Sequence, residues 1–127
     1  MKRLRYCFLL VDIGFITYWL ITILHLIPAE YLYNNYQSPV MVNWNWSFFP
    51  LDMIVSGSGL FSIYLQQKNN TDWRKWAFVS LLLTSISGLQ AIAYWAIAGE
   101  FSITWWLPNL FLLLYPLFFL PRLFKEL

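Results

Sequence analysis

Charged residues and cysteines are both scarce in this sequence. Only 11% of the 127 residues are charged, whereas 60% are hydrophobic and 21% are aromatic. A soluble domain carries about 25% charged residues. Because so short a chain with so few polar groups cannot cover a water-exposed surface, we expect an integral membrane protein. The single cysteine, Cys7, excludes an intramolecular disulfide and quinone-linked disulfide chemistry.

Other absences exclude further classes of protein. The sequence has no Gly/Ser-rich linker and no internal repeat of useful length, which indicates a single domain over residues 1–127. The formal net charge of +2 is too small to indicate a nucleic-acid partner. The lone histidine has no partners at metal-ligand spacing, so we predict no metal site, and no motif indicates a cofactor.

Four apolar stretches are each long enough to cross a hydrocarbon core of about 30 Å, which takes roughly 20 helical residues. The predicted spans are 4–27, 48–66, 76–98 and 103–124. Pro28 ends the first span, Pro50 lies in the first turn of the second, where a missing N–H costs nothing, and Gly99 ends the third. Lipid offers the backbone no partners, and the runs lack the alternation of barrel strands. The sequence therefore predicts an all-α polytopic bundle of four transmembrane helices.

The basic residues predict the orientation of these helices. Every Lys and Arg falls on one side of the predicted topology: Lys2, Arg3, Arg5, Lys68, Arg74, Lys75, Arg122 and Lys125. The two opposite connections carry Glu30 and Glu100 but no basic residue, so the positive-inside rule places both termini in the cytoplasm. A cleaved signal peptide is the competing interpretation, but the first apolar run is longer than a signal h-region and contains Asp12.

Asp12 lies about two turns inside the first predicted span. An ionisable group within a span costs about 2.5–3.5 kcal/mol on insertion scales, so its presence needs a reason. The functional interpretation is a proton or cation site. The structural interpretation is a buried carboxylic acid, neutral or hydrogen-bonded to another helix, that fixes packing. The sequence leaves both open.

Asp52 lies one turn inside the second predicted span from its outer end. Ser56 and Gly59 follow it at i+4 and i+7 and continue a narrow stripe along the same face. The functional interpretation is a ligand or proton site, whereas the structural one is a helix cap in front of a small-residue packing face. We expect Gly59 to make a close helix contact and Leu65 to face lipid or a looser seam.

Several polar and aromatic side chains fall at a similar depth in the outer half of the spans. Together they predict a small polar cavity, rimmed by aromatic residues, that opens outward. The candidate cavity residues are His25, Trp46, Asp52, Gln90, Tyr94, Glu100 and Asn109. The inference concerns depth, because the angular positions allow a cluster without requiring one. Gln90 also has a structural interpretation, since a small-residue stripe that indicates close packing lies beside it. That stripe consists of Ser80, Thr84, Ser87 and Ala91.

Two segments are distinctive: residues 44–52 (WNWSFFPLD) and 105–110 (WWLPNL). With Tyr18-Trp19 and Tyr115-Pro116, they resemble the YvaD-like family of small membrane proteins from Bacillus and relatives, over nearly the whole chain. The resemblance implies a bacterial plasma-membrane location. It implies no activity and no catalytic residue, because that family has no known function.

Two other four-helix families are similar in part. Small multidrug-resistance transporters are of similar length and have an acidic residue in the first helix, as Asp12 is here, but the rest of their pattern is missing. Sterol-isomerase-like EXPERA proteins bundle four helices around buried acidic and aromatic residues. The polar outer half is similar in kind, without a residue-by-residue motif match.

The sequence favours a non-enzymatic binding, accessory or immunity-type module that acts through its outer cavity or its helix faces. One alternative is a small proton-coupled transporter that works as an oligomer, with Asp12 and Asp52 titrating. Another is an EXPERA-like lipid-binding or isomerising enzyme that uses Asp52 with His25 or Glu100 as acid and base. The lipid bilayer is the expected environment, and a membrane-protein partner or a second copy of the chain stays open.

Overall fold

The computed structural model of the protein describes residues 2–24 and 39–127. These residues form four α-helices: α1 (Lys2–Leu24), α2 (Pro39–Gln67), α3 (Trp73–Ala98) and α4 (Ile103–Glu126). Each contains a stretch long and apolar enough to cross a membrane, with mean hydropathy from 1.4 to 2.1. The predicted all-α bundle of four membrane-spanning helices is confirmed.

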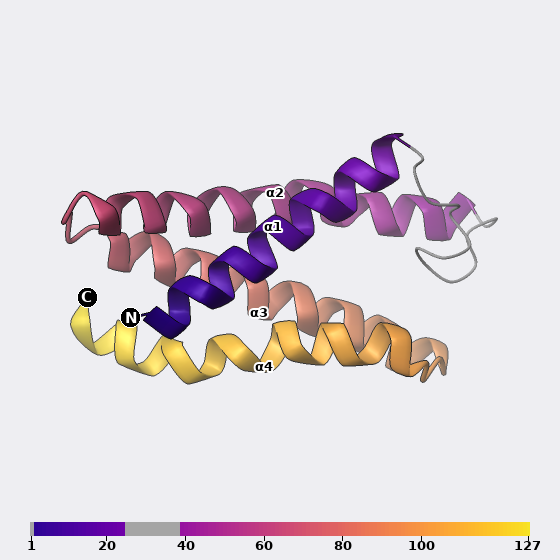
Figure 1. Cartoon of the computed structure of the whole chain (residues 1–127). Coiled ribbons are helices and arrows are strands. Elements are labelled where there is room, and N and C mark those ends of the chain that lie inside the picture. The colour runs from indigo at the N-terminus through magenta and orange to yellow at the C-terminus, as the bar shows by residue number, and fades with distance from the viewer. Residues whose placement is uncertain (1, 25–38) are drawn as a thin grey trace.

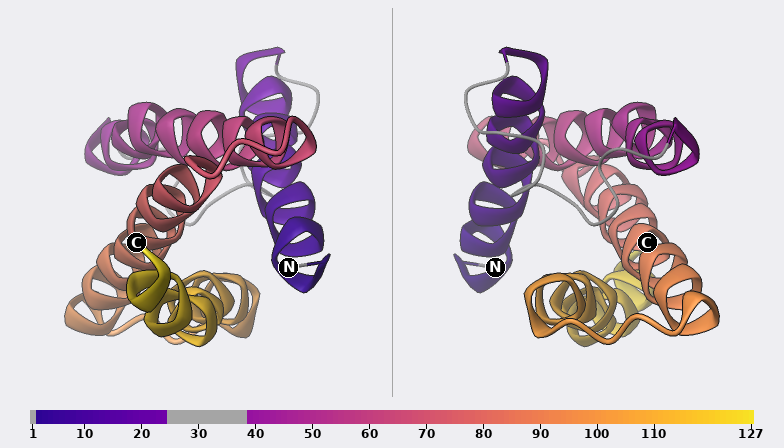
Figure 2. Two further views of the ribbon diagram at one scale, coloured as in Figure 1. Left: turned by 90° about the vertical axis from the view of Figure 1, so that its left-hand side faces the viewer. Right: turned by 90° about the vertical axis from the view of Figure 1, so that its right-hand side faces the viewer.

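The helices follow one another round the bundle in chain order (Figure 2). α2 packs against α1 and α3, and α3 packs against α4. The start of α1, the end of α4 and the α2–α3 connection lie at one end of the bundle, which we call the terminal end (Figure 1). α1 runs obliquely, so that it lies near α4 at the terminal end and diverges from it toward the opposite end (Figure 1).

The second helix begins at Pro39, whereas the sequence predicted Phe48. Proline suits a helix start. The Asn- and Trp-rich segment before Phe48, which the sequence predicted to be a loop, belongs to the helix. Its residues Met41 and Asn45 are buried on the same helical face as Asp52. Pro50 is consequently inside α2 rather than in its first turn. Its missing N–H removes one backbone hydrogen bond within the helix.

The third helix ends as predicted. Gly99 adopts the left-handed conformation with φ 76°, which glycine takes without strain. Its N–H donates to the Ala96 carbonyl, and the Glu100 N–H donates to the Trp95 carbonyl. These bonds satisfy carbonyls at the helix end and let the chain turn directly into α4.

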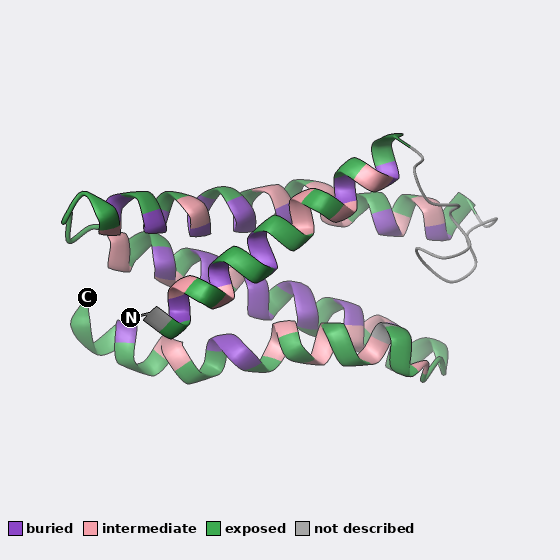
Figure 3. Ribbon diagram, in the orientation of Figure 1, coloured by how far each residue is buried: buried purple, intermediate pink, exposed green. Residues whose placement is uncertain are grey.

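The apolar core lies toward the terminal end, where α1 meets α4. Leu4 and Phe8 of α1 pack there in one cluster with Leu81 of α3 and with Tyr115 and Leu123 of α4. Buried residues form stripes along the inner faces of the helices, and outward faces are exposed (Figure 3). Because lipid is as apolar as these side chains, association depends on close packing and interhelical hydrogen bonds.

Two glycines mark the closest helix crossings. At Gly59 on α2, the space that a Cβ would take is occupied by the Asp12 carboxyl of α1. At Gly88 on α3, a Cβ would meet the α4 backbone, 2.6 Å from the Leu113 nitrogen. The predicted close contact at Gly59 is confirmed.

The prediction for Leu65 is wrong, because this side chain is buried. α2 packs against both α1 and α3, so its buried face is wider than the single stripe expected from the sequence. The small-residue stripe of α3 is confirmed as packing surface, since all of its members are buried.

Candidate functional site

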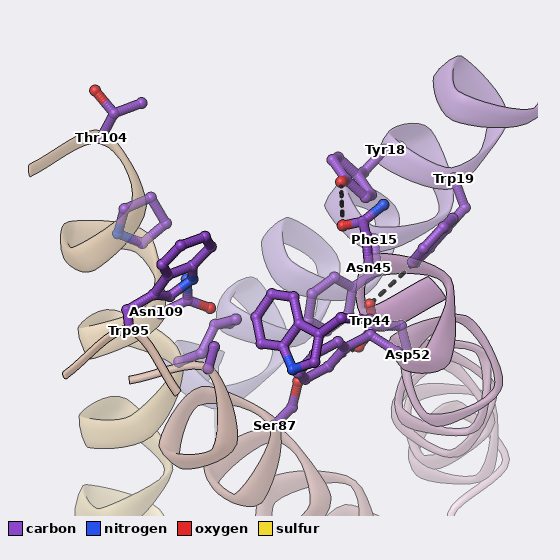
Figure 4. Close-up of a pocket in the computed structure, with 14 residues that line it drawn as sticks. Phe15, Tyr18, Trp19, Trp44, Asn45, Asp52, Ser87, Trp95, Thr104 and Asn109 are labelled. Carbon is purple, nitrogen blue, oxygen red and sulfur yellow. Dashed lines mark hydrogen bonds between the residues drawn. The ribbon is translucent and has the colours of Figure 1, made fainter. Parts of the chain in front are cut away.

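A cavity of about 320 Å³ lies in the half of the bundle away from the terminal end, where α1 and α4 diverge. All four helices contribute to its wall (Figure 4). The lining residues are Phe15, Tyr18, Trp19, Trp44, Asn45, Phe48, Asp52, Ser87, Ala91, Trp95, Thr104, Pro108, Asn109 and Leu112. The wall is thus mainly aromatic and apolar, with a few polar groups.

Asp52 is the acidic group of this wall and is only 5% exposed. Its Oδ2 accepts a hydrogen bond from the Trp19 indole N–H at 3.0 Å, and its Oδ1 accepts one from the Ser87 hydroxyl at 3.5 Å. The second bond is long for an O–H donor, which normally approaches to about 2.7–2.8 Å. Oδ1 therefore keeps most of its capacity to accept a bond from a ligand.

The helix-cap interpretation of Asp52 is wrong. α2 begins at Pro39, about three and a half turns before Asp52, so the carboxyl does not lie at a helix N-terminus. Its partners come from α1 and α3 instead. A buried carboxyl in mid-helix with two side-chain donors belongs to a tertiary polar contact.

Asn45 lies seven residues, or about two helical turns, before Asp52 on α2 and also lines the cavity. Its Oδ1 accepts a hydrogen bond from the Tyr18 hydroxyl at 2.9 Å, while its buried Nδ2 has no hydrogen-bond partner among the described residues. A buried amide donor without a partner is unusual and calls for a water or ligand acceptor. Asn45 therefore offers a second polar anchor beside Asp52.

Aromatic contacts hold the indole rings in place. Trp44 stacks on Tyr94 with centroids 4.4 Å apart and meets Trp95 edge-on at 5.5 Å. Trp19 packs against Trp46 at 5.0 Å. Tyr94 is in turn fixed by a hydrogen bond from its hydroxyl to the Met41 sulfur, at 3.0 Å.

The structure brings together only some of the residues predicted for the cavity. Asp52 and Asn109 line it. Tyr94 and Trp46 do not line it but pack against the lining rings Trp44 and Trp19.

Gln90 and Glu100 are exposed and do not line the cavity. Gln90 precedes the lining residue Ala91 by one position, which rotates it about 100° round the helix, and Glu100 follows the end of α3. His25 lies outside the described residues. Asp12 is buried elsewhere in the bundle and does not line the cavity.

Sequence reasoning missed the residues that shape the site most. Trp19 is not among the predicted cavity residues, and Ser87 belongs to the predicted packing stripe, yet both donate to Asp52. The i+7 spacing of Asn45 and Asp52 was the available signal, because it puts both on one face once α2 is extended to Pro39. Across residues 2–24 and 39–127, no three His, Cys, Asp or Glu side chains gather as a metal-binding group.

Comparisons with known proteins identify a family and add no activity. The chain is 48% identical over 126 residues to "Uncharacterized protein YvaD" of Bacillus subtilis (strain 168), a match that covers 99% of this chain and 95% of that protein. No solved structure matches. The model of the "Family of unknown function (DUF5360)" matches residues 4–127, so the chain belongs to this family.

Proposed function

We propose that the protein is a non-enzymatic binding module of the bacterial plasma membrane whose cavity accepts a small organic cation. The observation that carries this proposal is the Asp52 carboxyl, held in a chamber whose wall includes the indole rings of Trp19, Trp44 and Trp95. A carboxylate and several aromatic faces share one ligand preference, which is a positively charged group.

The physical chemistry of the wall supports a cation over other ligands. A cation over an aromatic face gains about 0.5–1 kcal/mol at exposed sites and about 2 kcal/mol when desolvated. No Lys, Arg or His is among the described residues that line the cavity, so an anion would meet no compensating charge. A neutral apolar ligand would leave the Asp52 carboxyl without a new partner, which is costly for a buried polar group.

The cavity volume limits the size of the ligand. About 320 Å³ is at the lower end of the range of roughly 300–1,000 Å³ found for small-molecule sites. A compact ammonium compound fits such a volume, whereas a whole phospholipid does not. The mostly apolar wall favours methyl or methylene groups around the charge.

The distribution of charge supports a cavity that opens to the outside. The described basic side chains belong to the terminal end, where Arg74 and Arg122 pair with Glu126. The positive-inside rule favours the cytoplasm for this end, so the cavity would lie in the outer half of the membrane.

A small proton-coupled transporter is the second candidate, favoured by two carboxyl groups, Asp12 and Asp52, buried within membrane-spanning helices. The enzyme alternative receives less support. It needed Asp52 beside Glu100 or His25, whereas Glu100 does not line the cavity and His25 lies outside the described part of the chain.

A pair of matched compounds tests the proposal. Choline and its uncharged carbon analogue 3,3-dimethyl-1-butanol have nearly the same shape. The melting temperature of the liposome-reconstituted protein is measured with each compound, and the difference between the two shifts gives the effect of charge. We expect stabilisation by choline alone. Equal stabilisation by both compounds, or by neither choline nor larger tetraalkylammonium ions, contradicts the proposal. Uptake of labelled choline driven by a proton gradient would favour the transporter over a binding module.

A further inference from the structure

Asp12 is a second buried acid, and its environment differs from that of Asp52. It is 0% exposed, and neither carboxyl oxygen has a hydrogen-bond partner among the described residues. No ion pair formed by residues 2–24 and 39–127 includes it. A buried ionised carboxylate without a partner is among the most unfavourable groups in a protein interior. The ionised form of Asp12 is therefore unfavourable in this position.

All four helices meet around this carboxyl. α2 contributes the bare backbone at Gly59, against which Asp12 Oδ2 lies, and the Ser80 hydroxyl of α3 lies 2.9 Å from the same Cβ position. Tyr115 of α4 is close enough to interact electrostatically with Asp12 and lies beside Thr84 of α3.

The titratable group that interacts with Asp12 is Tyr115 from α4, and Cys7 of α1 interacts with Tyr115 in turn. The described contacts of Asp12 with α2 and α3 involve Gly59, Ser56 and Ser80, none of which carries a charge. A neighbouring positive side chain therefore does not balance a negative charge on Asp12.

The direction of the hydrogen bonds decides what the hydroxyl groups of α2 and α3 can offer. Ser56 donates to the Asp12 backbone carbonyl at 2.9 Å, and Ser80 donates to the Val55 carbonyl at 2.9 Å. Thr84 donates to the Ser80 carbonyl at 2.7 Å. A hydroxyl has one proton, so these three oxygens now present only lone pairs. Lone pairs repel a carboxylate but accept a hydrogen bond from a carboxylic acid.

The packing selects the proton among possible cations. A metal ion needs several oxygen ligands at about 2.0–2.6 Å and room to accommodate them. Here the carboxyl already fills the space against Gly59 that a single methyl group would take. A proton needs no such volume, because it adds one O–H bond to an oxygen that is already in place.

We propose that Asp12 is a proton-binding site inside the bundle, where a proton taken from water forms an O–H bond on the carboxyl and the acid donates to a hydroxyl oxygen of α3. The site is separate from the cavity and does not depend on what the cavity binds. It gives the core a polar group that can exchange a proton without a charged partner.

Infrared spectroscopy tests this directly, because a protonated carboxyl has a C=O stretching band that a carboxylate lacks. In liposomes at neutral pH we expect such a band, shifted in D2O, that is lost in Asp12→Asn and kept in Asp72→Asn. Asparagine offers N–H donors to the same oxygens, so Asp12→Asn should remain folded by circular dichroism. A wild-type protein without the band, or a band that persists in Asp12→Asn, overturns the proposal.

A second measurement covers the case in which Asp12→Asn fails to fold. In an Asp52→Asn/Asp72→Asn protein grown with [4-13C]aspartate, Asp12 is the sole aspartate left in the sequence. We expect the acid band to move with the isotope. A band that does not move belongs to a glutamic acid, and the absence of any band shows an ionised Asp12; either result overturns the proposal.

Discussion

Gly59→Ala is the smallest change that tests the packing of the bundle. The new methyl group would fall where the Asp12 carboxyl lies and within 2.9 Å of the Ser80 hydroxyl. Both neighbours are fully buried, and Ser80 is held by its bond to the Val55 carbonyl. Neither can move aside without breaking contacts between α1, α2 and α3.

The magnitude follows from two opposing effects. Replacing a mid-helix glycine by alanine gains about 0.5–1 kcal/mol from reduced backbone freedom. Forcing a methyl group into a filled space costs about 1–3 kcal/mol. The net loss expected for Gly59→Ala is therefore between about 0 and 2.5 kcal/mol.

Gly57 provides a matched control two residues away on the same helix. It is exposed, and a Cβ there would meet nothing within 4 Å, so Gly57→Ala should keep only the favourable effect. The free energy of unfolding of both variants can be measured in detergent by circular dichroism during denaturation. Equal stability of the two variants would refute the assigned α1–α2 contact.

Two further predictions concern the site and the topology. Trp19→Phe removes the indole donor that lies 3.0 Å from Asp52 Oδ2. We expect it to destabilise the protein by about 1–3 kcal/mol, because a buried acceptor loses its partner. An unchanged melting temperature would mean that this hydrogen bond is not formed. In a Cys7→Ser background, Glu100→Cys should react with an impermeant thiol reagent added to intact cells, whereas Lys68→Cys should not. The reverse pattern would show that the predicted membrane orientation is inverted.

The number and type of the helices could be predicted from the sequence because the bilayer imposes them. Backbone groups find no hydrogen-bond partners in lipid, so these apolar runs must form helices. Gly99 could be recognised as the end of α3 because it directly follows an apolar run. The start of α2 was harder to place. Asn45 and the tryptophans beside it suit both a polar loop and a helix near the membrane surface, and tertiary burial of Asn45 decides between them.

The sequence could predict the membrane depth of the candidate site residues, but not which side of its helix each residue occupies. Asp52 and Asn109 were assigned to one level and do line one cavity, whereas Gln90 at a similar level is exposed. The difference arises from rotation about each helix axis, which packing between helices fixes and which hydropathy does not report. The same reason hid Trp19, whose role depends on how α1 crosses α2.

The affinity of the reconstituted protein for choline, followed through its tryptophan fluorescence, tests the central proposal most directly. The comparison is between wild type, Asp52→Asn and, as control, Asp72→Asn, which alters an exposed aspartate at the terminal end. Loss of the Asp52 charge should weaken binding at least tenfold, which corresponds to about 1.4 kcal/mol, while Asp72→Asn should bind as the wild type does. Equal affinity of Asp52→Asn and wild type would contradict the account.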